Sequence, residues 1–425
     1  MSTFYNGIEK RARGAWAIHH AQKTAATVNG SAEFSALDTA GKAASLLSQL
    51  AASEQITIEK TRVDALAKAA GLNARLEVPA LLDLLDARRL ISRSSVGDVE
   101  ILGLSSSATV AHAADLFDDL EPTEEEKAAI ALSEVTSSAP QSAARVIEFI
   151  GDEFKLSKSA RDNLIERSEV FGFVDAEGAG EDKLFFNGNL FRRDNLTKTA
   201  RVLGSLSSQE SALITSVDQM LASKGCMTVG DVEQKLGLKL FQKLMAAGMY
   251  DLNMVANNSG EFGFVTRPAA FHKFNDPVAD DAFDLAKALV AALTFGMTQS
   301  ESGRGKIEMI SALLRKLING GIVGPATAIG EDYRVLEHKG VLKLTPGPKY
   351  GFLMKLLKKD VGEMALAVLT TGDTAADVVD RPLPGVLSGY TGPERTRSQF
   401  RNKKQTPPSR KDTFDVLNAL RTGGL

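Results

Sequence analysis

Four stretches of the chain share one pattern of apolar and polar positions, in which a helix is followed by two short strands. In each stretch apolar residues first recur at the 3.6-residue period of a helix and then alternate with polar residues around a turn. Such alternation, bounded by Gly, Asn, Ser or Pro, is typical of a β-hairpin. The pattern predicts hairpins, each preceded by a helix of about ten residues, near residues 90–104, 170–188, 249–266 and 341–356.

The predicted hairpins recur at a nearly constant interval. Their first strands begin at Leu90, Val170, Met249 and Val341, which lie 80, 79 and 92 residues apart. A repeat on this scale indicates one supersecondary unit that is used several times.

Two of the hairpins are preceded by clear helix starts. Thr123 with Glu126, and Ser207 with Glu210, have the spacing of a capping box. Upstream of each hairpin there is room for two further helices. Three helices followed by a two-stranded wing resembles the winged-helix (helix-turn-helix) superfamily. The resemblance covers roughly residues 35–357 and indicates no particular family within it.

The resemblance implies a mainly α fold with small β-hairpins, arranged as tandem winged-helix units of three helices and a two-stranded wing each. The expected divisions are an N-terminal helical extension (1–34), a first unit (35–114), an acidic linker with a second unit (115–200), a third unit (201–275), a fourth unit with a trailing helix (276–371) and a basic, Pro/Gly-rich tail with a short terminal helix (372–425).

Composition agrees with helical packing in a reducing compartment. Aromatic residues make up 6% of the chain and hydrophobic residues 44%, which favours helices over large β-sandwiches. The single cysteine, Cys226, excludes an intrachain disulfide and a cysteine-based zinc cluster. The most apolar stretch, residues 285–297, is too short to span a membrane and contains Lys287. No export signal is visible at the N-terminus, so a cytoplasmic location without membrane contact is expected.

Charge is divided unevenly along the chain. Residues 301–425 hold 20 Lys and Arg against 13 Asp and Glu, whereas residues 1–300 hold 30 against 40. Such a division suggests one end that faces a polyanion, although it also arises by chance in long chains.

Lysines in the third and fourth units are the candidate contacts to nucleic acid. Winged-helix modules place the third helix in the major groove of DNA and the wing over the adjacent backbone, where Lys and Arg meet phosphates. The candidate residues are Lys235, Lys239 and Lys243 in the third unit, Arg334, Lys339, Lys343, Lys349, Lys355, Lys358 and Lys359 in the fourth, and Arg401, Lys403 and Lys404 in the tail. The alternative is that these side chains form solvated faces. The helix of the first unit carries Asp83 and Asp86 and is a poor match to DNA.

Motifs of catalysis are missing or incomplete in the sequence. Residues 303–306 lack the first glycine and the hydroxyl residue of a phosphate-binding loop, and neither HExxH nor GxSxG occurs. Asp175, Glu181 and Lys183 have the spacing of a metal-dependent nuclease, but they fall in a predicted wing. We therefore expect no catalytic residue, metal or cofactor.

The resulting hypothesis is a non-enzymatic protein that binds duplex DNA through tandem winged-helix units. The alternative is a scaffold or assembly subunit whose winged-helix units bind other proteins. In that case the acidic N-terminal units or the C-terminal tail would meet the partner subunits.

Overall fold

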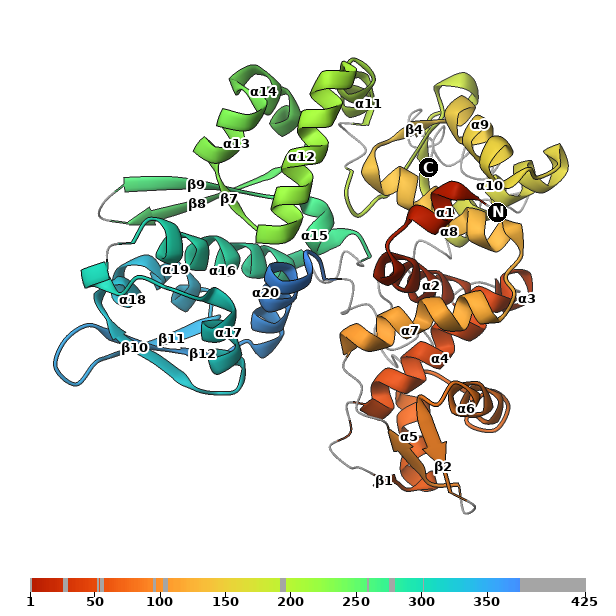
Figure 1. Cartoon of the computed structure of the whole chain (residues 1–425), viewed down its shortest axis with the longest axis horizontal. Coiled ribbons are helices and arrows are strands. Elements are labelled where there is room, and N and C mark those ends of the chain that lie inside the picture. The colour runs from red at the N-terminus through yellow and green to blue at the C-terminus, as the bar shows by residue number, and fades with distance from the viewer. Residues whose placement is uncertain are drawn as a thin grey trace, which may run out of the picture. The chain divides into compact units, whose positions relative to one another are not determined.

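The computed structural model describes residues 2–25, 30–51, 53, 57–94, 97–101, 106–191, 196–257, 260–274, 280–300 and 302–374. The chain is mainly helical and contains small three-stranded antiparallel sheets (Figure 1). It divides into two compact units, the first made mostly of residues up to Phe186 and the second mostly of Asn187–Asp377. From here on, first unit and second unit mean these two parts of the chain and not the predicted winged-helix repeats. The predicted tail from position 375 onward, with Arg401, Lys403 and Lys404, lies outside the described residues.

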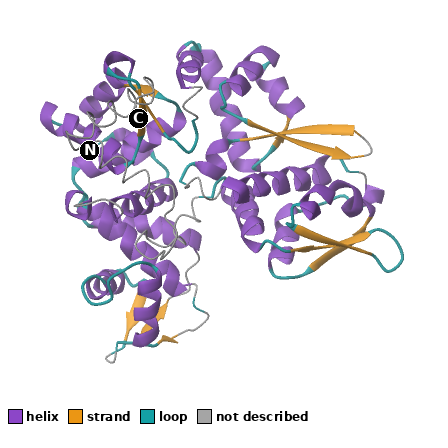
Figure 2. Cartoon of the chain, turned by 180° about the vertical axis from the view of Figure 1, so that it is seen from behind, coloured by secondary structure: helices purple, strands orange, loops and turns teal. Residues whose placement is uncertain are grey.

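One order of elements occurs four times in the described ranges: a helix, a short strand, two helices and a hairpin (Figure 2). We call each occurrence a module. In every module the last strand lies at the centre of the sheet, between the first strand of the hairpin and the short leading strand.

The first unit contains two modules. The first module consists of α4 (Ser35–Ala51), β1 (Thr57–Ile58), α5 (Lys60–Ala69), α6 (Val78–Ala87), β2 (Ile91–Arg93) and β3 (Val99–Ile101). The second consists of α8 (Glu124–Ser138), β4 (Gln141–Ser142), α9 (Ala143–Phe154), α10 (Lys158–Phe171), β5 (Asp175–Glu177) and β6 (Leu184–Phe186). The other helices of this unit are α1 (Thr3–Gly7), α2 (Lys10–Ala25), α3 (Gly30–Glu33) and α7 (Ser106–Asp119).

The second unit contains the other two modules. The third module consists of α12 (Ser208–Lys224), β7 (Met227–Thr228), α13 (Val229–Leu236), α14 (Leu238–Ala246), β8 (Asp251–Asn257) and β9 (Gly260–Thr266). The fourth consists of α17 (Ile310–Ile318), β10 (Ile322–Ala326), α18 (Thr327–Asp332), α19 (Arg334–His338), β11 (Leu342–Pro346) and β12 (Phe352–Leu356). The other helices are α11 (Leu196–Gly204), α15 (Pro268–His272), α16 (Asp280–Thr298) and α20 (Lys359–Thr371).

The four predicted hairpins are confirmed: β2 pairs with β3, β5 with β6, β8 with β9, and β11 with β12. The prediction of two strands in each sheet was wrong, because β1, β4, β7 and β10 each add a third. Three of these leading strands are two residues long, and two residues cannot show a period-2 pattern.

The helix expected before the fourth hairpin is also different from the prediction. In place of about ten continuous residues, two short helices meet at Tyr333, which has φ −112° and ψ 7°. The Tyr333 ring is buried, and its hydroxyl donates a hydrogen bond to the Ala292 carbonyl of α16 at 3.4 Å. The chain therefore leaves helical geometry where this side chain enters the core.

Helix α2 forms the centre of the first unit, and every residue of it from Gly14 to Ala21 is buried. It packs against α4 and α7. Both crossings depend on glycine: a Cβ at Gly14 would overlap the Val110 carbonyl of α7, and a Cβ at Gly41 of α4 would overlap the Ala21 methyl group. Close backbone approach of this kind leaves no room for a larger side chain.

A buried carboxylate ties two helix N-termini of the first unit together. Glu126 is 3% exposed, and it accepts hydrogen bonds from the backbone N–H groups of Ala36 at 2.8 Å and Leu37 at 3.3 Å, at the start of α4. It also accepts one from the Thr123 N–H at 3.0 Å, while the Thr123 hydroxyl accepts one from the Glu126 N–H at 3.2 Å. The predicted capping box is confirmed, and its carboxylate also satisfies free donors of a second helix.

We expect Glu126→Ala to lower the free energy of unfolding by about 2–3 kcal/mol, because it leaves buried N–H donors without an acceptor. Urea unfolding of the full chain measures this. Glu125→Ala is the matched control in the same helical turn. Since Glu125 makes a partly exposed ion pair with Arg167 at 3.8 Å, its loss should cost about 0–1 kcal/mol. Equal effects of the two substitutions would contradict the dual capping role.

A histidine is buried in the core of the first unit. The His20 ring stacks on Phe173 with centroids 3.9 Å apart, and its Nε2 lies 2.9 Å from the Ser133 hydroxyl. Burial lowers the pKa of His20 to about 3, and the charge of Lys23 acts in the same direction. The imidazole is therefore neutral in the folded protein at neutral pH.

The low pKa of His20 makes stability depend on pH. Because the unfolded histidine titrates near 6.5, the unfolded state binds more protons between pH 6.5 and about 3, and stability falls as pH falls through that window. Between pH 7 and pH 5 the contribution of His20 amounts to about 2 kcal/mol. Urea unfolding at the two pH values should show this loss for the parent. His20→Gln, which keeps a polar group near Ser133 but does not titrate, should lose about 2 kcal/mol less; an unchanged pH dependence would contradict the assignment.

Candidate nucleic-acid interface

Two predicted lysines lie side by side on the sheet of the fourth module. In the register of this sheet Lys343 of β11 is directly opposite Lys355 of β12, and Ile322 of β10 is opposite Lys355 on the other side. Side chains alternate between the faces of a sheet, so these three share one face. All three are exposed, whereas Leu342, Met354 and Leu356 on the other face are buried in the core. We call the exposed row of Ile322, Lys343 and Lys355 the basic face.

The charges of the basic face are not neutralised within the described ranges. Neither Lys343 nor Lys355 has a carboxylate at salt-bridge distance there. The nearby acidic groups are engaged elsewhere: Glu337 accepts a hydrogen bond from the Leu344 N–H at 3.0 Å, and Arg304 pairs with Glu331 and Asp332. Like charges directly opposite one another in an antiparallel pair are destabilising. The arrangement thus costs stability in the isolated protein.

The other candidates of the fourth module lie on several elements of it. All of them are exposed: Arg334 on α19, Lys339 after α19, Lys349 in the loop between β11 and β12, and Lys358 and Lys359 after β12. Arg334 donates from Nε to the Gly330 carbonyl at 2.5 Å, and Lys359 pairs with Glu363 at 3.3 Å. The structure therefore brings Lys343 and Lys355 directly together and places the rest on or next to α19, in the hairpin loop and after β12.

The third module presents its lysines on helices and none on its hairpin. Lys239 and Lys243 lie one turn apart on α14, and Lys235 lies in the last turn of α13, all exposed. The pKa of Glu210 lies below its ordinary value chiefly because of hydrogen bonds from Ser207, and the charges of Lys243 and Lys239 add to the effect. The hairpin itself, residues 251–266, contains no Lys or Arg.

The hairpin of the third module is held against α16 and the fourth module. Lys287 of α16, itself 7% exposed, pairs with Asp251 at 2.7 Å. At the far end of β8, Asn257 donates a hydrogen bond to Asp332 of α18 at 2.9 Å. The third and fourth modules consequently carry their basic residues on one compact unit.

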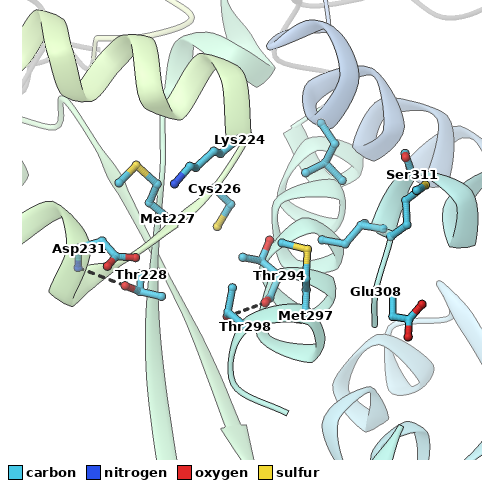
Figure 3. A pocket seen from close by; sticks show the side chains of 13 residues that line it. Lys224, Cys226, Met227, Thr228, Asp231, Thr294, Met297, Thr298, Glu308 and Ser311 are labelled. Carbon is cyan, nitrogen blue, oxygen red and sulfur yellow. Dashed lines mark hydrogen bonds between the residues drawn. The ribbon is translucent and has the colours of Figure 1, made fainter. Parts of the chain in front are cut away.

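A pocket of about 360 Å³ lies in the second unit, where the third module meets α16, α17 and α20 (Figure 3). Its lining combines methionines with hydroxyl groups, and it includes Cys226, Met227, Thr294, Met297 and Met309. Burial raises the pKa of Cys226 to about 12, so the thiol stays protonated at neutral pH. No histidine is among the lining residues, and besides Cys226 the ionisable side chains of the lining are Lys224, Asp231 and Glu308.

The acidic residues that resemble a nuclease motif do not form a metal site among the described residues. Lys183 pairs with Glu169 at 2.6 Å, and no group of three His, Cys, Asp or Glu side chains in those ranges could hold a metal ion. In the first module Arg93 pairs with Asp83 at 2.6 Å and Asp86 at 3.4 Å. The acidic helix of that module is thus partly neutralised by its own hairpin.

Comparisons of the chain with protein-family models, with curated proteins and with solved structures gave no match. Among the helices of the described residues, none is both long and apolar enough to cross a membrane.

The raised pKa of Cys226 predicts slow alkylation. At mildly alkaline pH, iodoacetamide should modify Cys226 in the folded protein at least about a hundredfold more slowly than in urea, since the thiolate is the reactive species. Mass spectrometry of quenched samples measures both rates. Ser311 is half-buried and lines the same pocket. The double variant Cys226→Ser with Ser311→Cys therefore provides the control. It should react faster than Cys226, and equal rates would show that the pocket protects every thiol alike.

Proposed function

We propose that the protein is a non-enzymatic DNA-binding protein whose modules are winged-helix units, with the fourth module as the principal contact to the duplex. The repeated order of three helices and a hairpin supports the first part. The choice of the fourth module as the principal contact rests on the cross-strand pair of Lys343 and Lys355. Both lysines are exposed and have no carboxylate partner in the described ranges.

Phosphates would remove the repulsion within this pair. The two lysines of the basic face, with Lys339, Lys349 and Lys358 of the same module, offer positive charge to the backbone of a duplex, where counterion release supplies most of the affinity. Such contacts position a protein on DNA without reading the bases. Lys235, Lys239 and Lys243 of the third module are exposed on α13 and α14 of the same compact unit and would offer a further, separate set of positive charges. Arg401, Lys403 and Lys404 of the tail add further charge.

We expect the double substitution Lys343→Ala and Lys355→Ala to weaken duplex binding and to flatten its salt dependence. Each neutralised phosphate contributes about 0.9 to the slope of log affinity against log salt concentration, so the slope should fall by about two. Fluorescence anisotropy with duplexes of unrelated sequence measures this, and the loss should be similar for all of them. Lys68→Ala with Lys158→Ala, two exposed lysines of the first unit, is the charge-matched control and should leave the slope unchanged.

A charge reversal distinguishes a binding role from a structural one. Lys355→Glu converts the like-charged pair into an opposite-charged pair, which should raise the free energy of unfolding by about 0.2–1 kcal/mol while duplex affinity falls. Unfolding in urea and anisotropy on the same preparation give both quantities. If the double alanine variant binds as the parent does, with the same salt slope, the basic face is a solvated surface and the DNA proposal is wrong.

A second candidate function, the binding of another protein, is favoured by the hairpin of the third module. Leu252 and Met254 on one face of β8 are 47% and 54% exposed. This face lies beside Val229 of α13, since a Cβ on Gly263 would come within 2.7 Å of the Val229 side chain and 3.5 Å of the Met254 sulfur. An exposed apolar surface without Lys or Arg suits a protein partner better than a phosphate backbone. In this reading the modules form a scaffold.

A further inference from the structure

The loop between β11 and β12 presents an aromatic side chain to solvent. Tyr350 is 67% exposed, beside the exposed Lys349. Its hydroxyl makes no hydrogen bond in the described part of the chain. The loop extends beyond the end of the sheet in both views (Figure 1, Figure 2).

The base of this loop makes close backbone contacts. The Gly347 N–H donates to the Gly351 carbonyl at 2.9 Å, directly beyond the last strand pair of Pro346 and Phe352. Gly351 has φ +66°, and a Cβ there would lie 2.7 Å from the carbonyl carbon of Ala326. A Cβ on Gly347 would likewise come within 2.8 Å of Pro325. The loop therefore packs closely on the end of β10.

Prolines restrict this loop further. Pro346 and Pro348 flank Gly347, and each fixes its own φ near −65°. Because the two prolines narrow the backbone conformations of the loop, less conformational entropy is lost when the exposed ring binds a flat apolar surface.

The chemistry of Tyr350 and Lys349 matches an unpaired nucleotide. A ring next to a cation binds single strands by stacking on a base while the cation meets the phosphate. Within a duplex both faces of each base are already stacked, so the free face must come from an unpaired base. Three strand residues, or about 10 Å, separate Lys343 from Pro346 at the start of the loop, which is about three base steps of 3.4 Å.

We propose that the fourth module binds a junction between duplex and single-stranded nucleic acid, with the duplex backbone on the basic face and the first unpaired bases on Tyr350. This inference rests on the proposed function, because it takes the basic face as the duplex site. It assigns to the loop the preference for a junction over a continuous duplex.

The experiment compares three probes by fluorescence anisotropy: a blunt duplex, the same duplex with a short single-stranded overhang, and the single strand alone. The parent should bind the overhang duplex most tightly. Tyr350→Ala should lose roughly fivefold or more of the affinity for the overhang duplex, the lower end of what one stacked base contributes, with less than about a twofold change for the blunt duplex. Tyr350→Phe keeps the ring and should behave as the parent does. A fluorescent base analogue at the first unpaired position should be quenched by the parent and by Tyr350→Phe, and not by Tyr350→Ala.

The outcomes separate the two proposals. If Tyr350→Ala changes all three probes equally, or none of them, the junction proposal is overturned, while the effect of Lys343→Ala with Lys355→Ala on the blunt duplex still decides the proposed function. Suppose that Lys343→Ala with Lys355→Ala leaves the affinity for every probe unchanged, whereas Tyr350→Ala lowers the affinity for the overhang duplex. The basic face is then not the duplex site, and the loop binds single strands without it. Absence of binding to any probe by the parent overturns both.

Discussion

The apolar surface of α16 is the constraint on which the second unit depends. Phe295 contacts Phe262 and Phe264 of the third module, with ring centroids 4.8 and 6.5 Å away. Other residues of the same helix belong to one core cluster with α17, β11, β12 and α20. Burial of apolar side chains is the main favourable contribution to folding. Because the third and fourth modules share this buried cluster, they are not independent domains on a flexible linker. Their surfaces keep a fixed relation to each other.

The packing of α16 explains why the third and fourth modules, which share one topology, have different surfaces. In the third module one face of the sheet packs through Val265 on the helices of its own module and leaves Leu252 and Met254 exposed, while the second face, with Val255 and Phe264, is buried in the cluster around α16. In the fourth module the corresponding second face is exposed and holds Lys343 and Lys355. A sheet face that is covered needs apolar side chains, whereas an exposed one is free to carry charge. Packing thus assigns a structural role to one face and leaves the other available for binding.

The first unit uses its polar groups differently. Glu126 accepts hydrogen bonds from the N-termini of two helices, and Arg93 pairs with Asp83 and Asp86. His20 is buried as a neutral imidazole. The hydrogen bonds of Glu126 and the ion pairs of Arg93 engage these charges within the fold and do not leave them for a ligand.

The sequence by itself determined the elements whose signals are local. Hairpins follow from alternation around Gly, Asn and Pro, and the helix starts at Thr123 and Ser207 follow from capping chemistry, because both depend on residues a few positions apart. Only the tertiary structure decided which residues meet across the chain. The pairing of Lys343 with Lys355 depends on strand register, the strand β10 is defined by its partner β12, and the break before α19 comes from the burial of Tyr333 against α16. These features arise from contacts between distant segments, and no local pattern encodes such contacts.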